Sequence, residues 1–584
     1  MSERADQADR TADPFALPSL LWLRFLLMAA TILAVTADLA DTLIQSLPND
    51  PPNPAVGTHC WYVHLEMAGS GPQPLPPPTD PTYTTKYFAL VFGNAQCFVK
   101  PNPLPISPEL AGAGIVVALC AAIYLLTPTW RVLRSGLIPV RKLPGIGAEL
   151  EELARLAGVR VRFTADVLNL GVGGLAFGRV GRRYVVLNRG LLQLAGTDRA
   201  AFRAVVLHEL AHVRNQDLDV SYLTVVLWRV FLAVVLLPTL ILFHGELDAD
   251  SVNGLGQLEF WAQLGALALV VLVLHHAILR ERELRADIRA AGWSGDVSAL
   301  LRVLDAAPVP ERRRLRSAGW LSRPAESLQR TFRLHPSPEE RRLAVAEPGR
   351  SPAAAVQGFA LGLAFALTWT AAFLDVVEPF RAMHLIPHGM DPPESVVPGL
   401  IVITASMGLV LSFAVWRAVL VGPGAGGWGQ ANRLAAAVCA GLLVGDVLNG
   451  QNSILGPEIS PLSLSARATW WALLVVGTWV CIGWFAVTAL AWRSVLRRIG
   501  PGLPTAIGTV LGAALFGGWL GWVFSLRLDE NLVDIDSSAA FLRYAFHSAL
   551  RQAAAWPGES LTRTLLVSVI AFPALGLVLR RAHC

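Results

Sequence analysis

Two histidines four positions apart, with a glutamate beside the first, are the side chains best arranged to do chemistry. They stand in the segment His208-Glu209-Leu210-Ala211-His212. A helix advances 3.6 residues per turn, so His208 and His212 would share one face and could bind one metal ion. Glu209 would sit one step round the same turn, where a base acting on an attacking water should lie. The pattern predicts a zinc hydrolase site, although five residues can also arise by chance.

A third protein ligand, which a tetrahedral catalytic zinc needs, is expected from a charged segment downstream, at Glu283. Glu283 and Asp287 are again four positions apart, so one can bind the metal while the other orients a ligand histidine. Taken alone, the segment is more typical of a basic helix end leaving a membrane. His276, seven positions before Glu283, is a conceivable replacement ligand, although interfacial histidines commonly meet headgroups and water.

The elements that must position these residues are membrane helices, because the composition is too apolar for an ordinary soluble protein. Of the 584 residues, 53% are hydrophobic and only 16% are charged. Ten stretches approach the roughly 20 residues that cross about 30 Å of hydrocarbon. They are residues 19–41, 109–127, 220–243, 257–279, 354–374, 397–420, 432–449, 468–492, 503–525 and 563–581. The expected fold is mainly α, a polytopic membrane protein of about ten transmembrane helices with a small α+β cytoplasmic catalytic domain.

Lysines and arginines collect in alternate connections between these spans, which indicates their orientation. With the amino terminus in the cytoplasm, the basic residues fall inside: Arg131, Arg134, Arg141, Lys142, Arg280, Arg282, Arg285, Arg289, Arg493, Arg497, Arg498, Arg580 and Arg581. The sequence therefore predicts a multi-pass protein of the cell membrane, with both termini and the zinc site cytoplasmic. The third and fourth spans would form a hairpin that returns Glu283 to the side of the membrane where His212 lies.

Short elements lead up to the histidine pair within the cytoplasmic part. We expect a helix over 148–157 that ends at Gly158, a strand over 159–163, a hairpin of 174–179 with 183–187, and a helix cap at Thr197 or Asp198. Zinc peptidases commonly hold an extended peptide against a sheet edge beside the metal helix. Residues 174–179 are the expected edge, with Ala176, Phe177 and Gly178 as substrate contacts. The alternative is that they only complete a small sheet.

The chain resembles the membrane-embedded zinc metallopeptidases typified by the HtpX heat-shock protease and the CAAX prenyl protease. The resemblance covers roughly residues 130–350. Its motifs, in family order, are His208-Glu-Leu-Ala-His212 with Asn215 and Asp217, Glu283-Leu-Arg-Ala-Asp287, and His335-Pro336 with Arg341. It implies a zincin-like fold and one zinc per chain, bound by His208, His212 and Glu283. It also implies that Glu209 is the general base and that Asp287 is the partner of a ligand histidine.

The third motif supplies candidates for a role across the cleft from the metal. The family comparison favours His335 or Arg341 as a donor to the oxyanion of the reaction. The alternative is that His335-Pro336 merely starts a helix over 338–346. Asn215 and Asp217 are expected to be structural, fixing the end of the metal helix.

Four regions follow from these features. Residues 1–18 are a cytoplasmic tail, 19–127 are two transmembrane helices around a long Pro-rich outer loop, 128–350 are a zinc metallopeptidase domain interrupted by a membrane hairpin at 220–279, and 351–584 are a six-helix membrane domain. Cys60 and Cys97 lie in the outer loop, where an oxidising compartment would allow a disulfide. The alternative is two unpaired thiols.

The expected function is zinc-dependent endopeptidase activity at the cytoplasmic membrane face, in quality control or processing of membrane proteins. The expected partners are protein or peptide substrates, including membrane proteins, and the lipid bilayer. The net charge of +5 comes largely from arginines near membrane ends and does not indicate nucleic acid. Because the six spans after residue 350 depart from the family, the alternative is a catalytically weak or inactive membrane sensor or scaffold. The sequence predicts no oligomeric state.

Overall fold

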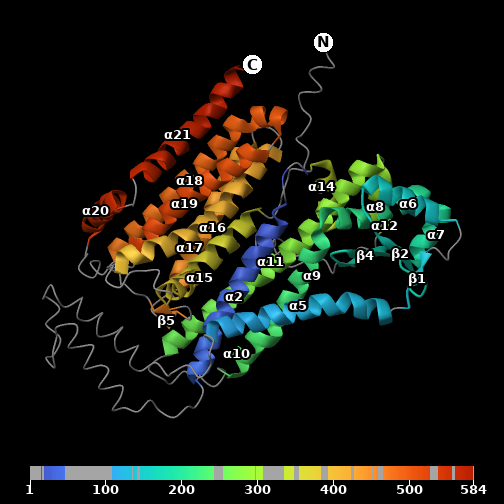
Figure 1. Cartoon of the computed structure of the whole chain (residues 1–584), viewed down its shortest axis with the longest axis horizontal. Helices are drawn as coiled ribbons and strands as arrows, with labels where there is room; N and C mark the ends of the chain where they lie inside the picture. Colours follow the sequence, from blue (N-terminus) through green and yellow to red (C-terminus); the bar gives the residue numbers. More distant parts are fainter. Residues whose placement is uncertain are drawn as a thin grey trace, which may run out of the picture.

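The structure, a computed structural model, describes most of the chain (Figure 1). The described residues are 15, 17, 19–46, 108–134, 136–140, 145–242, 254–295, 297–306, 335–347, 354–382, 392–421, 426–449, 452–453, 456–457, 464–500, 502–526, 537–555 and 559–582. Cys60 and Cys97, and with them the predicted disulfide, lie outside these residues.

Long apolar helices make up most of the described chain. They are α2 (Leu21–Ser46), α5 (Pro108–Arg134), α11 (Gly254–Ser294), α15 (Ala354–Ala382), α16 (Pro392–Val421), α17 (Gly426–Leu448), α18 (Leu464–Ile499), α19 (Gly502–Ser525) and α21 (Glu559–Ala582). One further apolar helix is α9 (Asp217–Val230), which continues through a π-helical turn, η3 (Phe231–Leu236), into α10 (Leu237–Leu242). Two more elements of this part are α20 (Ser538–Ala555) and the pair β5 (Asn452–Ser453) and β6 (Gly456–Pro457).

Six of the predicted spans coincide with helices that are long and apolar enough to cross a membrane. These stretches are Ala111–Arg134, Asp217–Ile241, Phe260–Ser294, Trp428–Leu448, Ser465–Leu496 and Gly502–Ser525. The other four predicted spans coincide with shorter apolar stretches, Leu21–Ala37, Ala355–Trp369, Thr404–Leu420 and Val567–Arg580. The described residues therefore support the membrane character, whereas the number of ten spans stays a prediction.

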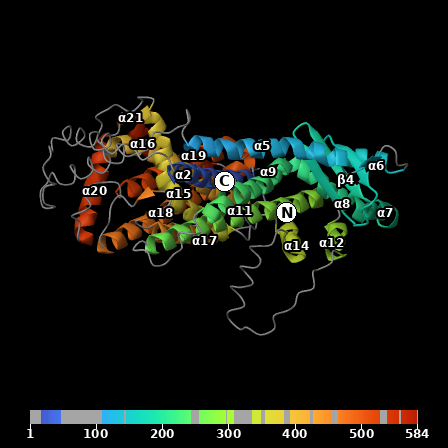
Figure 2. The same cartoon turned by 90° about the horizontal axis from the view of Figure 1, so that it is seen from below.

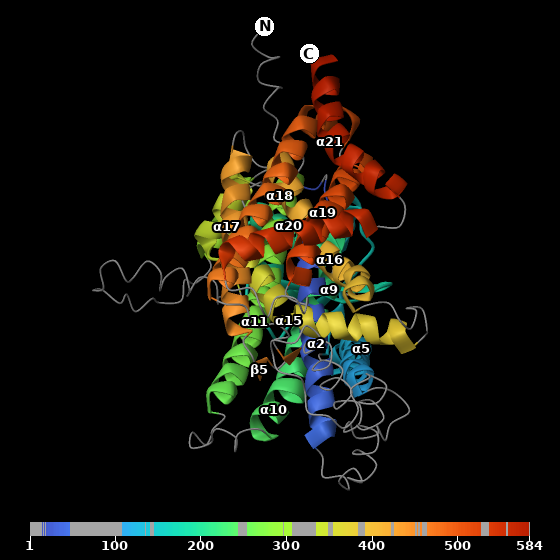
Figure 3. The ribbon, with the colours of Figure 1, turned by 90° about the vertical axis from the view of Figure 1, so that its left-hand side faces the viewer.

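The apolar helices pack into two cores that share α15. One core, formed with α16 to α20, includes Trp416 and Trp470. Figure 3 shows the ribbons of these helices gathered together. The other joins α2, α5, α9 and α11 around Met28 and Phe231. Figure 1 shows α11 running from beneath the carboxy-terminal helices to the small domain at the right, so this single helix connects the membrane part with that domain.

The small domain contains a four-stranded sheet in the order β1-β2-β4-β3. Its strands are β1 (Ile138–Pro139), β2 (Arg162–Asp166), β3 (Gly174–Arg179) and β4 (Arg182–Asn188). The predicted hairpin is confirmed, because β3 pairs antiparallel with β4 and forms the edge of the sheet. The strand predicted over 159–163 begins three residues later. Gly158 and Val159 instead donate their N–H groups to Arg155 and Ala154 and so complete the preceding helix.

Five helices accompany the sheet. They are α6 (Gly147–Ala157), α7 (Arg189–Thr197), α8 (Arg199–Asn215), α12 (Val297–Ala306) and α14 (Pro338–Ala346). Gly158, at φ +65°, ends α6 as predicted. Asp198 is the N-cap of α8, since its carboxylate accepts the N–H of Ala201 at 3.0 Å. The predicted helix over 338–346 is α14, whose first turn is closed by a capping box of Ser337 and Glu340.

Helix α11 is longer than its predicted span. The sequence suggested a membrane helix over 257–279 followed by a separate charged segment, but Gly254–Ser294 is one helix of 41 residues. At 1.5 Å per residue it is about 60 Å long, twice the hydrocarbon thickness. The membrane hairpin therefore delivers Glu283 to the small domain on a continuous helix.

Candidate metal centre

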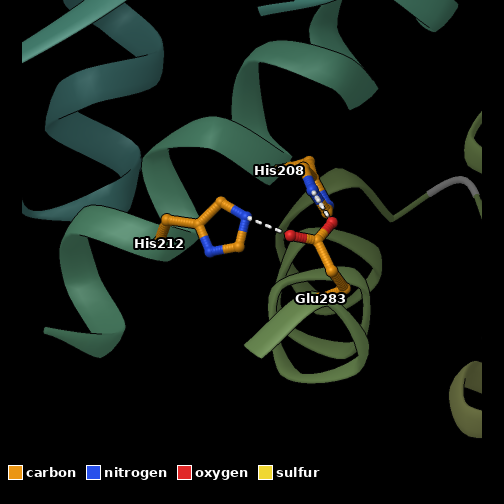
Figure 4. Close-up of side chains that lie close together, drawn as sticks. All are labelled: His208, His212 and Glu283. Carbon is orange, nitrogen blue, oxygen red and sulfur yellow. Dashed lines mark ion pairs between the residues drawn. The ribbon is translucent and has the colours of Figure 1, made fainter. Parts of the chain in front are cut away.

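Helices α8 and α11 bring His208, His212 and Glu283 together (Figure 4). All three side chains are buried, and one ligand atom of each lies within 4.8 Å of the others. The two carboxylate oxygens of Glu283 lie 3.6 Å from Nε2 of His208 and 3.8 Å from Nε2 of His212. As predicted, the two histidines share one face of a helix, and Glu283 lies beside them. Among the described residues, one group of three or more His, Cys, Asp or Glu side chains could hold a metal ion, and it is this triad.

Each histidine has a carboxylate behind it, on the side away from Glu283. Oδ1 of Asp287 lies 2.9 Å from Nδ1 of His208, and Oδ1 of Asp217 lies 3.1 Å from Nδ1 of His212. The hydrogen bond between His212 and Asp217 orients one ring, Asp287 lies in ion-pair contact with the other, and both Nε2 atoms are directed toward the third ligand. Two imidazole nitrogens and one carboxylate are donors that suit zinc, so the residues fit the metal that the sequence predicted.

Asp217 does more than the structural role expected of it. Helix α8 ends at Gln216, which adopts the left-handed conformation with φ +56°, and α9 begins at the next residue. This tight connection turns Asp217 back onto His212, five positions earlier. Asn215 makes no hydrogen bond with its buried side-chain atoms in the part of the chain that the structure describes.

Arg341 of α14 lies behind the metal centre, on Asp287. Its Nε and Nη2 donate to the two oxygens of Asp287, each at 2.5 Å, in a bidentate pair. Burial lowers the pKa of Arg341, but Asp287 more than offsets this and raises it. The structure therefore places Arg341 as a support for Asp287. Its predicted contact with substrate stays a prediction.

Arg282 is a neighbour of the site that the sequence reasoning missed. Its Nη2 and Nε donate to Oε1 of Glu283 at 2.5 and 3.1 Å. This is the same oxygen that lies toward His212. A position directly before a ligand gives no periodic signal, since adjacent residues point to different faces of a helix.

The edge strand β3 lies directly beside Glu209. Oε2 of Glu209 accepts the backbone N–H of Ala176 at 2.7 Å. A Cβ atom at Gly174 would lie 2.8 Å from Cγ of Glu209, so only glycine permits this approach. The strand predicted as the substrate edge is therefore next to the predicted base.

The other two residues expected at the edge have different surroundings. Phe177 is buried and stacks on Tyr184 of β4, with ring centroids 5.3 Å apart, and Arg131 of α5 lies over its ring. Gly178 has φ +131°, and a Cβ there would lie 2.2 Å from the carbonyl oxygen of Arg182. Both residues shape the strand, while contact with a peptide stays a prediction.

Helices α5 and α9 contact the β3–β4 hairpin. The hydroxyl of Tyr124 donates to Asp219 of α9 at 2.6 Å, and Arg183 of β4 donates to the same carboxylate. Figure 2 shows α5 running along the molecule to the sheet. The β3–β4 hairpin is thus fixed to α9 through Arg183, and α5 contacts the same carboxylate.

Two other histidines lie away from the triad. His335 is exposed and immediately precedes Pro336 and the N-cap of α14. Within the described part of the chain, no hydrogen bond or ion pair joins His335 to His208, His212 or Glu283, so its predicted catalytic role is untested. His276 donates from Nδ1 to the carbonyl oxygen of Leu272 at 2.7 Å and is outside the triad.

Comparisons with known proteins agree with this geometry. The family model described as peptidase family M48 matches residues 146–348. Three relatives named "Protease HtpX homolog" come from Pyrococcus abyssi, Acidiphilium cryptum and Lactobacillus helveticus, at 30%, 28% and 24% identity. The matches cover 29%, 33% and 39% of this chain and 58%, 68% and 84% of those proteins. No solved structure matches significantly.

The matched region contains the whole metal centre. It includes the triad, Glu209, the two aspartates behind the histidines, and the edge strand, but none of the helices after α14. The chain spans little more than half the length of the Pyrococcus abyssi relative. Residues 146–348 of this chain are therefore similar to peptidase family M48.

Proposed function

We propose that this chain is a membrane-integrated, zinc-dependent endopeptidase that hydrolyses peptide bonds at the cytoplasmic face of the cell membrane. The observation that carries the proposal is the convergence of two Nε2 atoms and a carboxylate beside Glu209 and a sheet edge. Three protein ligands with an open fourth position are the arrangement of catalytic zinc, so one ion per chain is expected. The protease names of the relatives support this assignment.

The chemistry divides between the metal and the chain. Zinc, when bound, polarises the scissile carbonyl and lowers the pKa of a water toward about 7. Glu209 takes the proton from the attacking water and later passes it to the leaving amine. Asp287 and Asp217 keep the two imidazoles in the orientation that the metal requires. We assign to His335 a hydrogen bond to the oxyanion.

The substrate is proposed to be an extended segment of a protein, including membrane proteins during quality control or processing. It would lie along β3, where main-chain hydrogen bonds do not depend on substrate sequence. Ala176, Phe177 and Gly178 belong to this edge. Arg341 uses Nε and Nη2 on Asp287, which leaves Nη1 for a substrate carbonyl.

Zinc binding is expected to release about one proton from the metal-free protein at pH 7. Burial lowers the pKa of His208, but Asp287 and Glu283 more than offset this effect and raise it from 6.5 to about 10. The charged ring stabilises the metal-free fold fully below about pH 6.5, and this contribution is lost as the pH rises through about 10. Zinc requires the neutral ring, so its affinity should increase by up to about tenfold per pH unit between pH 7 and 9. Calorimetry in buffers of different ionisation enthalpy counts the protons, and a heat that is the same in every buffer would contradict the assignment.

Metal removal tests the proposed function most directly. The purified full chain should contain one zinc by elemental mass spectrometry and should cleave an unfolded casein. A chelator should abolish cleavage, and added zinc should restore it, because the water is activated only at the metal. A well-folded chain that holds no zinc at neutral pH and cleaves nothing would reject the enzyme and leave the scaffold alternative.

A further inference from the structure

Charged side chains of α2, α11 and α16 lie close to one another outside the metal centre. They are Arg24 on α2, Glu281, Arg285 and Arg289 on α11, and Arg417 on α16, a group we name the arginine cluster. Arg24 forms an ion pair with Glu281. Arg285 and Arg417 also act electrostatically on this carboxylate. Three guanidinium groups of the cluster therefore act on the carboxylate of Glu281.

Phe15 and Leu17, which precede α2, contact the cluster. Arg417 donates to the carbonyl oxygen of Leu17 at 3.1 Å. The guanidinium carbon of Arg289 lies 3.7 Å from the ring centroid of Phe15, and that of Arg285 lies 5.2 Å from it. These contacts hold arginines from separate helices together despite their mutual repulsion.

Two buried donors in this group lack acceptors. Arg24 is only 6% exposed, yet its Nη2 has no hydrogen-bond partner among the described residues. Nη1 of Arg285 is also buried and has no hydrogen-bond partner among the described residues. Leaving a buried donor without an acceptor destabilises the fold, and the free-energy cost is larger when the donor belongs to a charged group. Unpaired donors in an excess of positive charge are the features of a site that takes an anion.

We propose that the arginine cluster binds a phosphate-class anion, either the headgroup of an anionic phospholipid or free phosphate. A phosphate offers several acceptor oxygens, and planar guanidinium forks match its geometry. The anion would link α2 and α16 to α11 at Arg285, two positions after the metal ligand Glu283. It would thereby attach the carboxy-terminal helices to the helix that carries part of the metal centre.

The test measures thermal stability of the full chain by tryptophan fluorescence. In neutral detergent the chain is titrated with inorganic phosphate. In parallel it is placed in nanodiscs of phosphatidylcholine with or without phosphatidylglycerol. We expect the anion to raise the melting temperature, and Arg285→Gln and Arg417→Gln to require at least about tenfold more of it. Arg580→Gln, an exposed arginine of α21, should behave as wild type.

Glu281→Gln provides a variant with the opposite expectation. It removes the carboxylate that competes with the anion, so it should melt lower without phosphate or phosphatidylglycerol and gain more from them than wild type. Protection by phosphate supports the site and identifies free phosphate as sufficient, whereas protection by phosphatidylglycerol alone supports it and identifies the lipid headgroup.

Two results would overturn the proposal. The first is no protection by either probe. The second is equal protection of wild type and both arginine variants. These readouts need no peptidase activity, so they are independent of the proposed function.

Discussion

Glu209→Gln is expected to lower peptide hydrolysis by about 10²–10⁴-fold while zinc stays bound. The amide keeps the size of the carboxylate and retains an oxygen that can accept the N–H of Ala176, which donates to Oε2 at 2.7 Å. It cannot take a proton from water at neutral pH, so the step assigned to Glu209 is lost. The measurements are cleavage of casein and the zinc content of the purified variant.

The control for this variant is Glu151→Gln, which removes a carboxylate from an exposed position of α6 and should keep both zinc and full activity. A Glu209→Gln chain that folds, holds zinc and cleaves casein at the wild-type rate would remove Glu209 from the mechanism. Loss of zinc together with activity would instead mean that Glu209 is needed to assemble the site.

Local spacing accounts for the part of the site that the sequence predicted. His208 and His212, and likewise Glu283 and Asp287, are four positions apart, and the helical period alone places each pair on one face. Joining the two pairs required only that the intervening membrane helices form a hairpin. For the same reason the hairpin was found, because two short segments, 174–179 and 183–187, joined by a turn are a local signal.

The contacts behind the ligands had no local signal. Asp217 reaches His212 through the left-handed conformation of Gln216, which its residue type does not favour. Arg341 reaches Asp287 across 54 positions, which depends on where α14 packs. The continuity of α11 was missed for another reason. Its charges were read as the end of a membrane helix, yet helix formers such as Glu, Arg and Ala continue the same helix into the small domain.

His212→Ala is expected to abolish tight zinc binding, and Asp217→Asn is expected to weaken it by about 10–100-fold. Alanine removes one of three donor atoms, whereas asparagine keeps the shape beside His212 and loses only the charge that orients and polarises its ring. His276→Ala is the matched control, because that imidazole contacts Leu272 and lies outside the triad. Zinc affinities come from competition with a chelator of known strength.

The order of these affinities distinguishes a ligand from a residue that supports one. A loss in Asp217→Asn as complete as in His212→Ala would contradict the supporting role, since the oxygens of Asp217 lie 3.1 and 3.2 Å from Nδ1 of His212, on the side away from Glu283. No loss at all would show that the connection at Gln216 places Asp217 there only to end the helix, as the sequence suggested. An intermediate loss fits only the arrangement in which Asp217 acts through His212, and the tenfold range reflects how much of the ring's orientation the packing of α8 already fixes.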